Sequence, residues 1–510
     1  MSRPILIAGI AAAAGAAALF YAAPFQSTGS QPVTGMIPAG AQLCLEAKDL
    51  RAELAAWNGS GEKQRWLASR RYEGFSRSNL FFKLQRAWQE LSDAAGFVPG
   101  WDVADSLAGR ESALAIYNIG EVQFLYVTRL PAAAAMQSVL WRSRARYETR
   151  HAGGFEFFVR TSGKRTVAFA AARDCLILGS NEDYVAGALR LLSGERLPSV
   201  VDDPWYKDSA SAAGRPGDLR LVMNLNELVK APQFRSYWVQ RNVAEVGLYS
   251  AAIADVTRDG GSFREDRVLL RKTPLTAPPT TGERLVRLAP DDVDFYRAWS
   301  EPQAGDVAAL IQQKIFTTPA AAPINRDQAP EVDVDAPTAG ADTDLETRID
   351  LAPLEAPADR TAQLLRALLQ SVKLTGAIQI QTTEPVADGV FMKTPTVIAV
   401  EAATAWPATT IPQVTVHGNL LLISNSDALL GEVTARLNAR VGASNSTAVA
   451  VFRHAHARPG YQRLMSAVDR TAGFFSTDLV SLSEVFRDIS VVEIRTQDQG
   501  ARVRETVSYR

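Results

Sequence analysis

Residues 4–23 constrain the cellular location of this chain more than any other stretch does. They carry no charged side chain and consist, after Pro4, of Ala, Ile, Leu, Gly, Phe and Tyr. At about 1.5 Å of rise per residue, a helix of this length spans roughly 30 Å, the thickness of a bilayer's hydrocarbon core. Arg3 precedes the apolar run, and the positive-inside tendency keeps that end in the cytoplasm. The segment therefore predicts export of everything that follows it.

The same segment, residues 1–24, fits either a cleaved signal peptide or a retained anchor. A signal peptide needs small residues just before the cleavage site. Cleavage after Ala23 would put Tyr21 where a small residue is needed, and Pro24 directly after the cut. We therefore expect an uncleaved, single-pass anchor in a bacterial inner membrane, with the bulk of the chain on the periplasmic or extracellular side. Secretion to the periplasm after signal cleavage is the alternative.

The length of the chain indicates more than one domain. Its 510 residues exceed what one hydrophobic core usually supports. We expect a tether over residues 25–36, a first lobe over 37–272, a Pro/Thr linker over 273–281 and a second lobe over 282–510. Residues 318–359 of that second lobe are rich in Pro, Ala, Asp and Glu, which predicts an acidic disordered insert.

The two lobes are predicted to be diverged copies of each other. Residues 176–183 and 420–427 align without gaps, which matches Ser180 with Ser424. Each stretch is an apolar run followed by polar residues and then a helical pattern, as in a buried strand, an N-cap and a helix. We expect the serine to cap the helix, and an anion pocket at the helix start is the alternative.

Strand pairs without regular βαβ alternation favour an α+β fold. Residues 114–117 and 122–127 are predicted to pair, as are 155–159 and 167–171. Residues 79–97 are predicted to form an amphipathic helix. Its apolar stripe contains Leu80, Leu84, Trp88 and Leu91. We expect two tandemly repeated α+β lobes behind a single N-terminal transmembrane helix.

Charge and cysteine content narrow the classes of function. The chain has 54 basic and 55 acidic residues, whereas a nucleic-acid-binding protein normally shows a strong basic excess, so we expect no nucleic-acid partner. Its two cysteines, Cys44 and Cys175, both lie in apolar runs. An oxidising compartment would allow them to form one disulfide, and two buried thiols are the alternative.

No motif predicts catalytic, cofactor-binding or metal-binding residues. The sequence has neither a Gly-x-Ser-x-Gly elbow nor a phosphate-binding glycine loop. Ser60 and Lys63 match the Ser-x-x-Lys pattern of penicillin-binding enzymes, but they lie in an expected polar loop and the companion Lys-Thr-Gly motif is absent. His454 and His456 would share one face of a strand, and His417 could approach from another strand. A zinc site needs three or four ligands in a fixed geometry, and no second ligand pair stands out nearby.

Four closely spaced arginines form the candidate surface for an anion or a partner. They lie between Trp141 and His151 and are Arg142, Arg144, Arg146 and Arg150. Such a set suits anionic headgroups, a polyanionic glycan or an acidic protein. A solvated face balanced by nearby carboxylates is the alternative.

Two short runs resemble an uncharacterised family of exported, membrane-anchored bacterial proteins. These are Ile-Pro-Ala-Gly-Ala at residues 37–41 and Cys-Leu-Ile-Leu-Gly-Ser-Asn at residues 175–181. The resemblance implies no activity. We expect a non-catalytic extracytoplasmic binding or scaffold protein, held at the membrane by its N-terminal helix, with a protein partner in the cell envelope. An envelope hydrolase without a local motif and a periplasmic chaperone or assembly factor are the alternatives.

Overall fold

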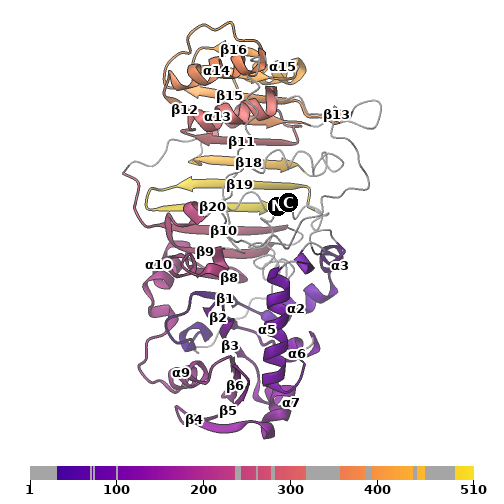
Figure 1. Cartoon of the computed structure of the whole chain (residues 1–510), viewed down its shortest axis with the longest axis vertical. Coiled ribbons are helices and arrows are strands. Elements are labelled where there is room, and N and C mark those ends of the chain that lie inside the picture. Colours follow the sequence, from indigo (N-terminus) through magenta and orange to yellow (C-terminus); the bar gives the residue numbers. More distant parts are fainter. Residues whose placement is uncertain are drawn as a thin grey trace, which may run out of the picture. The chain divides into compact units, whose positions relative to one another are not determined.

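The computed structural model describes residues 31–68, 72, 75–77, 79–98, 101–235, 243–259, 262–276, 282–316, 357–382, 384–385, 392–439, 445–453 and 489–510. The expected transmembrane segment, the first part of the tether, nearly all of the acidic insert, His454 and His456 lie outside these residues. Within the part that is described, no helix has the length and apolar character needed to span a bilayer. The chain combines helices with antiparallel sheet, so its fold class is α+β (Figure 1).

The chain divides into two compact units. Unit 1 contains residues 1–279, 451–456 and 468–510, and unit 2 contains residues 280–450 and 457–467. The break after Pro279 falls inside the expected linker. The expected second lobe, 282–510, is corrected, because its C-terminal strands belong to unit 1.

Unit 1 is built on an antiparallel sheet. Its strands, in spatial order, are β4 (Glu148–Ala152), β5 (Phe155–Ser162), β6 (Arg165–Ala172), β7 (Cys175–Gly179), β3 (Gln123–Arg129), β2 (Ser112–Asn118), β1 (Leu43–Ala47), β8 (Leu219–Asn224), β9 (Tyr249–Asp259), β10 (Ser262–Arg271), β20 (Arg502–Tyr509) and β19 (Val491–Asp498). The predicted pairs β2–β3 and β5–β6 are confirmed. Gly163, with a φ of +59°, closes the β5–β6 turn, where a residue with a Cβ would be strained.

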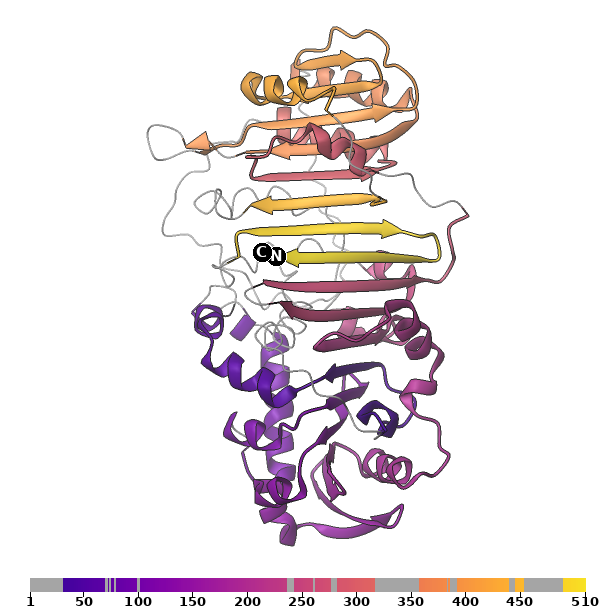
Figure 2. The same cartoon turned by 180° about the vertical axis from the view of Figure 1, so that it is seen from behind.

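Helices pack on both faces of the unit 1 sheet around β6 (Figures 1 and 2). Alternate residues of a strand point to opposite faces. Ala168 and Ala170 of β6 accordingly join the core with α9 (Glu182–Ser193), whereas Val167 and Phe169 join the core with α5 (Asn79–Ala95). The other helical elements of the unit are η1 (Val33–Met36), α2 (Leu50–Gly59), α3 (Gly61–Leu67), α6 (Trp101–Leu107), α7 (Ala132–Gln137), α8 (Val139–Ser143), η2 (Arg144–Arg146), η3 (Val200–Asp202), α10 (Pro204–Ala213), α11 (Leu225–Leu228) and α12 (Val243–Val246).

Unit 2 has a smaller antiparallel sheet with the same alternation. Its strands, in order, are β16 (Val414–His417), β17 (Leu420–Ser424), β15 (Thr396–Ala402), β12 (Leu374–Gln381) and β11 (Phe295–Ser300), and β11 also pairs with β18 (Ala448–Arg453). One face packs on α13 (Ala304–Ile311), η7 (Gln312–Phe316) and α14 (Pro357–Gln370). The other face packs on η6 (Glu283–Leu288) and α15 (Asp427–Ala435). A short hairpin, β13 (Glu384–Pro385) and β14 (Met392–Lys393), completes the unit.

The helix caps differ from the expected ones. Asn181, not Ser180, caps α9 by accepting a hydrogen bond from the Asp183 amide at 2.9 Å. Ser426, not Ser424, caps α15. Ser180 instead accepts a hydrogen bond from the Phe124 amide of β3 at 2.8 Å, so it ties two strands together. The positions where each strand passes into its helix were predicted correctly, but the capping residues were not.

Candidate functional site

A concave polar surface lies on unit 1 where β10, β20 and β19 run side by side. Its volume is about 440 Å³. The antiparallel register places Asp266 of β10 opposite Thr506 of β20, and Thr506 opposite Arg495 of β19, so alternate residues of three strands share this face. We call this surface the arginine groove. Its polar lining comprises Arg264, Asp266, Arg267, Glu493, Arg495, Gln497, Arg504, Glu505, Thr506, Ser508 and Arg510.

Positive charge exceeds negative charge in the arginine groove, because five arginines and three acidic residues line it. The guanidinium of Arg264 donates to Asp266 at 2.8 Å. Arg495 and Arg510 both donate to Glu493. Arg504 donates to the main-chain carbonyl of Ala212 at the end of α10, and the described residues place no carboxylate in an ion pair with it. An anionic ligand would complete this set of charges.

A buried ion pair holds the strands beneath the arginine groove. The nearly buried side chain of Arg267 of β10 donates to both carboxylate oxygens of Glu265, at 2.6 and 2.8 Å. It also donates to Glu505 of β20 at 3.3 Å. Burial raises the pKa of Glu505, although Arg267 opposes this effect. Removing one member of such a buried set leaves an uncompensated charge, so these residues lock β10 to β20.

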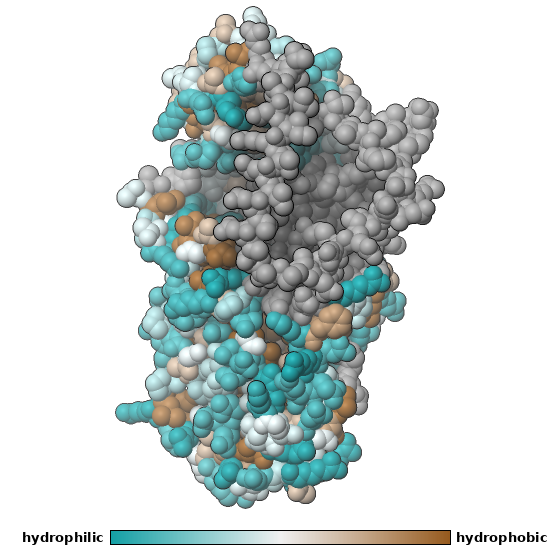
Figure 3. All heavy atoms as spheres, viewed as in Figure 1, coloured by the Kyte–Doolittle hydropathy of each residue, from teal (hydrophilic) through white to brown (hydrophobic). Residues whose placement is uncertain are grey.

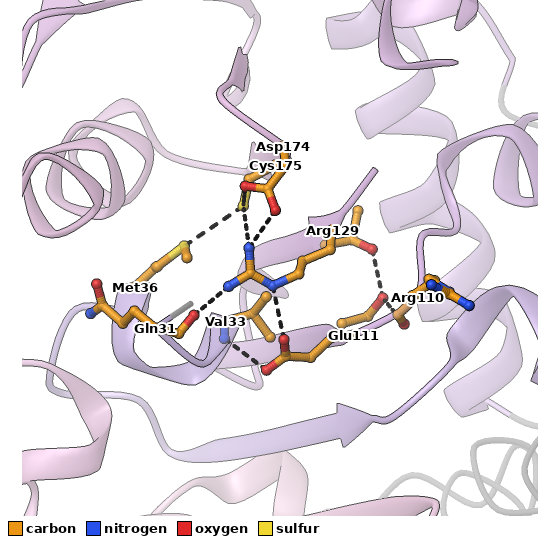
Figure 4. A network of polar contacts seen from close by, with 10 residues as sticks. Gln31, Val33, Met36, Arg110, Glu111, Arg129, Asp174 and Cys175 are labelled. Carbon is orange, nitrogen blue, oxygen red and sulfur yellow. Dashed lines mark hydrogen bonds and ion pairs between the residues drawn. The ribbon is translucent and has the colours of Figure 1, made fainter. Parts of the chain in front are cut away.

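A second polar network clamps the start of unit 1 (Figure 4). Arg129, at the end of β3, donates to Glu111 at 2.9 Å and to Asp174 at 2.6 Å, and also to the main-chain carbonyl of Gln31. Glu111 in turn accepts a hydrogen bond from the Val33 amide at 3.0 Å. These charge-assisted bonds attach the segment that begins at Gln31 to the strands of unit 1.

Two carboxyl groups of unit 1 have strongly raised pKa values. Burial raises the pKa of Glu46 to about 7, even though Tyr206 donates a hydrogen bond to it. Burial raises the pKa of Glu53 to about 8, and one of its carboxyl oxygens has no hydrogen-bond partner. Such groups can act as general acids or bases when they face a cleft.

Neither of these acids lines the two cavities found among the described residues. They are absent from the arginine groove and from a second cavity of about 370 Å³, which lies between η1 and the loop after α9. No group of three or more His, Cys, Asp or Glu side chains among the described residues is placed to hold a metal ion.

The structure places the four predicted arginines on an exposed surface away from the arginine groove. Arg142 lies in α8, Arg144 and Arg146 in η2, and Arg150 in β4. Arg144 stacks on the Trp141 ring, 4.8 Å from its centroid, and Arg150 pairs with Glu148 at 2.7 Å. The sequence interpretation missed the groove, although Arg504 and Ser508 alternate with apolar residues in β20, a pattern that marks a polar sheet face.

Cys44 and Cys175 are both buried, free thiols, so the predicted disulfide alternative is wrong. Cys44 lies in β1 and Cys175 in β7, with β2 and β3 between them. Three strand spacings place β1 and β7 about 14 Å apart, whereas a disulfide needs Cα atoms within about 7 Å.

Ser60 is a helix cap. Its hydroxyl accepts a hydrogen bond from the Lys63 amide at 3.1 Å at the start of α3, which corrects the expected polar loop at this position. The Lys63 ammonium donates to Asn58 at 2.6 Å. The Ser-x-x-Lys spacing therefore reflects local helix capping.

The sequence matches no protein-family model and no curated protein. Among solved structures, crystal form I of TP0453 is similar over 48% of this chain and 80% of its own, with 12% identity and a TM-score of 0.27. Crystal form III of TP0453 gives 12% identity over 48% of this chain and 81% of its own, with a TM-score of 0.26. Similarity this distant carries no argument about fold or function.

Proposed function

We propose that this protein is a non-catalytic, membrane-anchored extracytoplasmic binding protein whose arginine groove receives an acidic segment of a protein partner in the cell envelope. One observation carries this role: five arginines and only three acidic residues line a concave surface, in a chain whose net charge is −1. Guanidinium groups bind carboxylates in a planar, two-pronged geometry, so glutamate and aspartate side chains suit this surface.

The polar character of the groove also bears on the class of ligand. Its lining consists mainly of charged and hydroxyl side chains, with Ala213 and Val268 as apolar members. Burial of an apolar ligand here would leave charged groups without water, which costs free energy. An acidic chain instead exchanges water for charge-assisted hydrogen bonds, and its binding weakens with salt because screening acts on exposed charges.

Two diverged α+β repeats are proposed as the framework. Support comes from the order of strands in the sheets, β6–β7–β3–β2–β1–β8 in unit 1 and β16–β17–β15–β12–β11–β18 in unit 2. In both units a 3-10 helix precedes the first strand, and an α-helix follows the strand that ends at residue 179 or 424. Equivalent elements in an equivalent order are the expected outcome of duplication.

The apolar segment at residues 4–23 is proposed to be a retained anchor in a bacterial inner membrane. Support comes from the firm attachment of Gln31 to the strands through Arg129. The eight peptide units from Ala23 to Gln31 extend at most about 28 Å, so a membrane-spanning segment would hold the start of unit 1 close to the bilayer. Such a short tether suits a protein that acts at the membrane surface.

The groove is tested with full-length protein in a neutral detergent and a fluorescein-labelled ten-residue polyglutamate peptide. Fluorescence anisotropy should show binding that weakens from low to physiological salt. The double variant R504E/R510E should weaken binding at least about tenfold, because two attractive charges become repulsive.

The matched control makes the same charge change on the other arginine surface. R142E/R144E should bind the peptide with the affinity of the unaltered protein. If R142E/R144E abolishes binding and R504E/R510E does not, the predicted arginine cluster is the binding surface instead. A peptide that fails to bind the unaltered protein at low salt would refute the proposed role of the groove.

A further inference from the structure

A strongly basic and aromatic stretch runs through α3 and into α5. Between Lys63 and Trp88 the sequence has seven basic residues and one acidic residue, in a chain whose total net charge is −1. The same stretch contains six of the chain's aromatic residues. Aromatic rings interleaved with lysine and arginine are typical of protein surfaces that meet anionic lipid headgroups.

Three large apolar side chains in the N-terminal half of α5 are exposed. Leu84 and Trp88, one turn apart on the same stripe, are 44% and 49% exposed, and Phe82 is 56% exposed. Ala94 and Ala95, in the last turn of the helix, are buried against β5 and β6. The helix is therefore packed on the sheet at its end, whereas its beginning presents leucine and aromatic side chains to the surroundings.

Neighbouring rings extend this apolar region. The Phe75 and Phe81 ring centroids lie 5.4 Å apart, and those of Phe81 and Phe82 lie 6.2 Å apart. At the end of α3, Leu67 is also exposed. In Figure 3 isolated apolar residues interrupt a mainly hydrophilic surface over the helices of unit 1. We call this region the aromatic face. It comprises Phe75, Phe81, Phe82, Leu84 and Trp88.

Exposed basic side chains border the aromatic face. Lys83 and Arg86 lie on α5 between its apolar residues, and Arg77 precedes the helix. Arg86 pairs with Glu90 at 3.0 Å, but its side chain is still 82% exposed. Long basic side chains can extend to phosphate groups while the rings beside them enter the headgroup layer.

We propose that the aromatic face of unit 1 rests in the headgroup layer of a bilayer that contains anionic phospholipid. The basic excess matches the negative surface of such a bilayer, which attracts Lys and Arg side chains. A second copy of this chain is a poorer partner for the aromatic face, because two basic surfaces repel each other. The groups involved are separate from the arginine groove, so the two sites are independent.

This contact adds a second attachment to the proposed N-terminal anchor. A single-pass helix alone leaves the attached unit free to turn about its tether. Contact through Leu84 and Trp88 would fix which side of unit 1 faces the membrane. Two weak membrane signals acting together bind far more stably than either alone.

The test uses full-length protein in vesicles of phosphatidylethanolamine and phosphatidylglycerol. Single cysteines at Leu84→Cys and Trp88→Cys are labelled with an environment-sensitive dye, while the native thiols Cys44 and Cys175 are buried and do not react in the folded protein. Spin-labelled lipid should quench both dyes roughly twofold or more, and replacing phosphatidylglycerol with phosphatidylcholine should remove most of this quenching. The control is Lys207→Cys, on an exposed turn of α10 that should stay unquenched.

Three results would overturn the proposal. One is the absence of quenching at both positions in vesicles that contain phosphatidylglycerol. Another is a dye that already emits at short wavelength in detergent and is not quenched by spin-labelled lipid, which would indicate a protein contact. The third is a disulfide-linked dimer of Trp88→Cys, which would indicate a second copy. Peptide binding to the arginine groove is measured in detergent, so either site can fail without the other.

Discussion

Two amphipathic helices, α5 in unit 1 and α14 in unit 2, differ in how far their apolar stripes are buried. Each helix lies in the connection between the first two strands of its unit's sheet. In α14, Leu365 and Leu369 are one turn apart and are 1% and 0% exposed. In α5, Leu84 and Trp88 are also one turn apart and are about half exposed. An apolar stripe on a helix therefore predicts that the stripe is buried against a partner, but it does not predict that the partner belongs to the same chain.

The difference comes from what packs beside each helix. In unit 2, Leu365 and Leu369 join a core with Val307 and Ile311 of α13 and with Ile398 of the sheet. In unit 1, the core that contains the end of α5 is formed mainly by β5, β6 and α8, and it includes neither Leu84 nor Trp88. A second helix covers the stripe in one unit, and the described residues offer no equivalent cover in the other.

The largest expected effect lies in α14. Leu369→Ala should lower the free energy of unfolding of unit 2 by about 2–5 kcal/mol, because it removes a fully buried side chain and leaves a cavity. Urea denaturation, with hydrogen exchange of β12 and β15 peptides as the local probe, would measure this loss. A loss well below 1 kcal/mol would mean that the stripe of α14 is not a core element.

The units also differ in the charge that their sheets bury. The pKa of Glu46 in unit 1 is raised by burial to about 7, above the ordinary value of 4.5. The folded protein therefore holds this proton more tightly than the unfolded chain does. Protonated Glu46 therefore contributes stability that is fully present below pH 4.5 and is lost as the pH rises to about 7. This lowers the free energy of unfolding by about 3 kcal/mol. Glu53, with its pKa raised to about 8, adds a slope of the same sign.

Glu46→Gln should remove this part of the pH dependence in unit 1. Unit 2 should show no corresponding slope from Arg297, because burial lowers its pKa only to about 10 and it stays charged across this range. Urea unfolding of the two proteins between pH 4.5 and 8, with hydrogen exchange of β1 and β11 peptides, would measure the effect. An unchanged slope in the Glu46→Gln variant would contradict the assignment of the proton to Glu46.

The smallest expected effect on stability is in α5. Leu84→Ala, the counterpart of Leu369→Ala, should change the free energy of unfolding by about 0.5 kcal/mol or less, because the side chain is already exposed. The same variant should reduce lipid quenching of a dye at position 88. A stability loss equal to that of Leu369→Ala would show that part of this chain covers the stripe, and would remove the contrast between the two helices.

Local features were predictable from the sequence and long-range ones were not. The β2–β3 and β5–β6 pairs follow from alternation and short turns, and both were predicted correctly. The pairing of β10 with β20 joins residues more than two hundred positions apart, from Phe263 with Tyr509 to Leu270 with Arg502. No local pattern encodes such a contact, so both the extent of unit 1 and the arginine groove were missed.

The candidate site was predictable only as a type of chemistry. Arginine on an exposed surface was the expected feature, and the cluster from Arg142 to Arg150 is indeed exposed. A concave set of arginines instead forms where residues 264–268, 493–497 and 504–510 meet. Each of these strands alone has the ordinary alternation of a half-exposed strand, and only their registered pairing brings Arg264, Arg495 and Arg504 onto one face.

The sequence by itself determined the α+β class, the main hairpins, the amphipathic character of α5 and the apolar segment at residues 4–23. These depend on periodicity and composition over a few residues, and short-range sterics and hydrophobicity act on that scale. Tertiary structure decided that Cys44 and Cys175 stay apart, that the C-terminal hairpin completes unit 1 and that Leu84 and Trp88 are about half exposed. Each of these depends on which distant strands pair, because strand pairing sets both distance and burial.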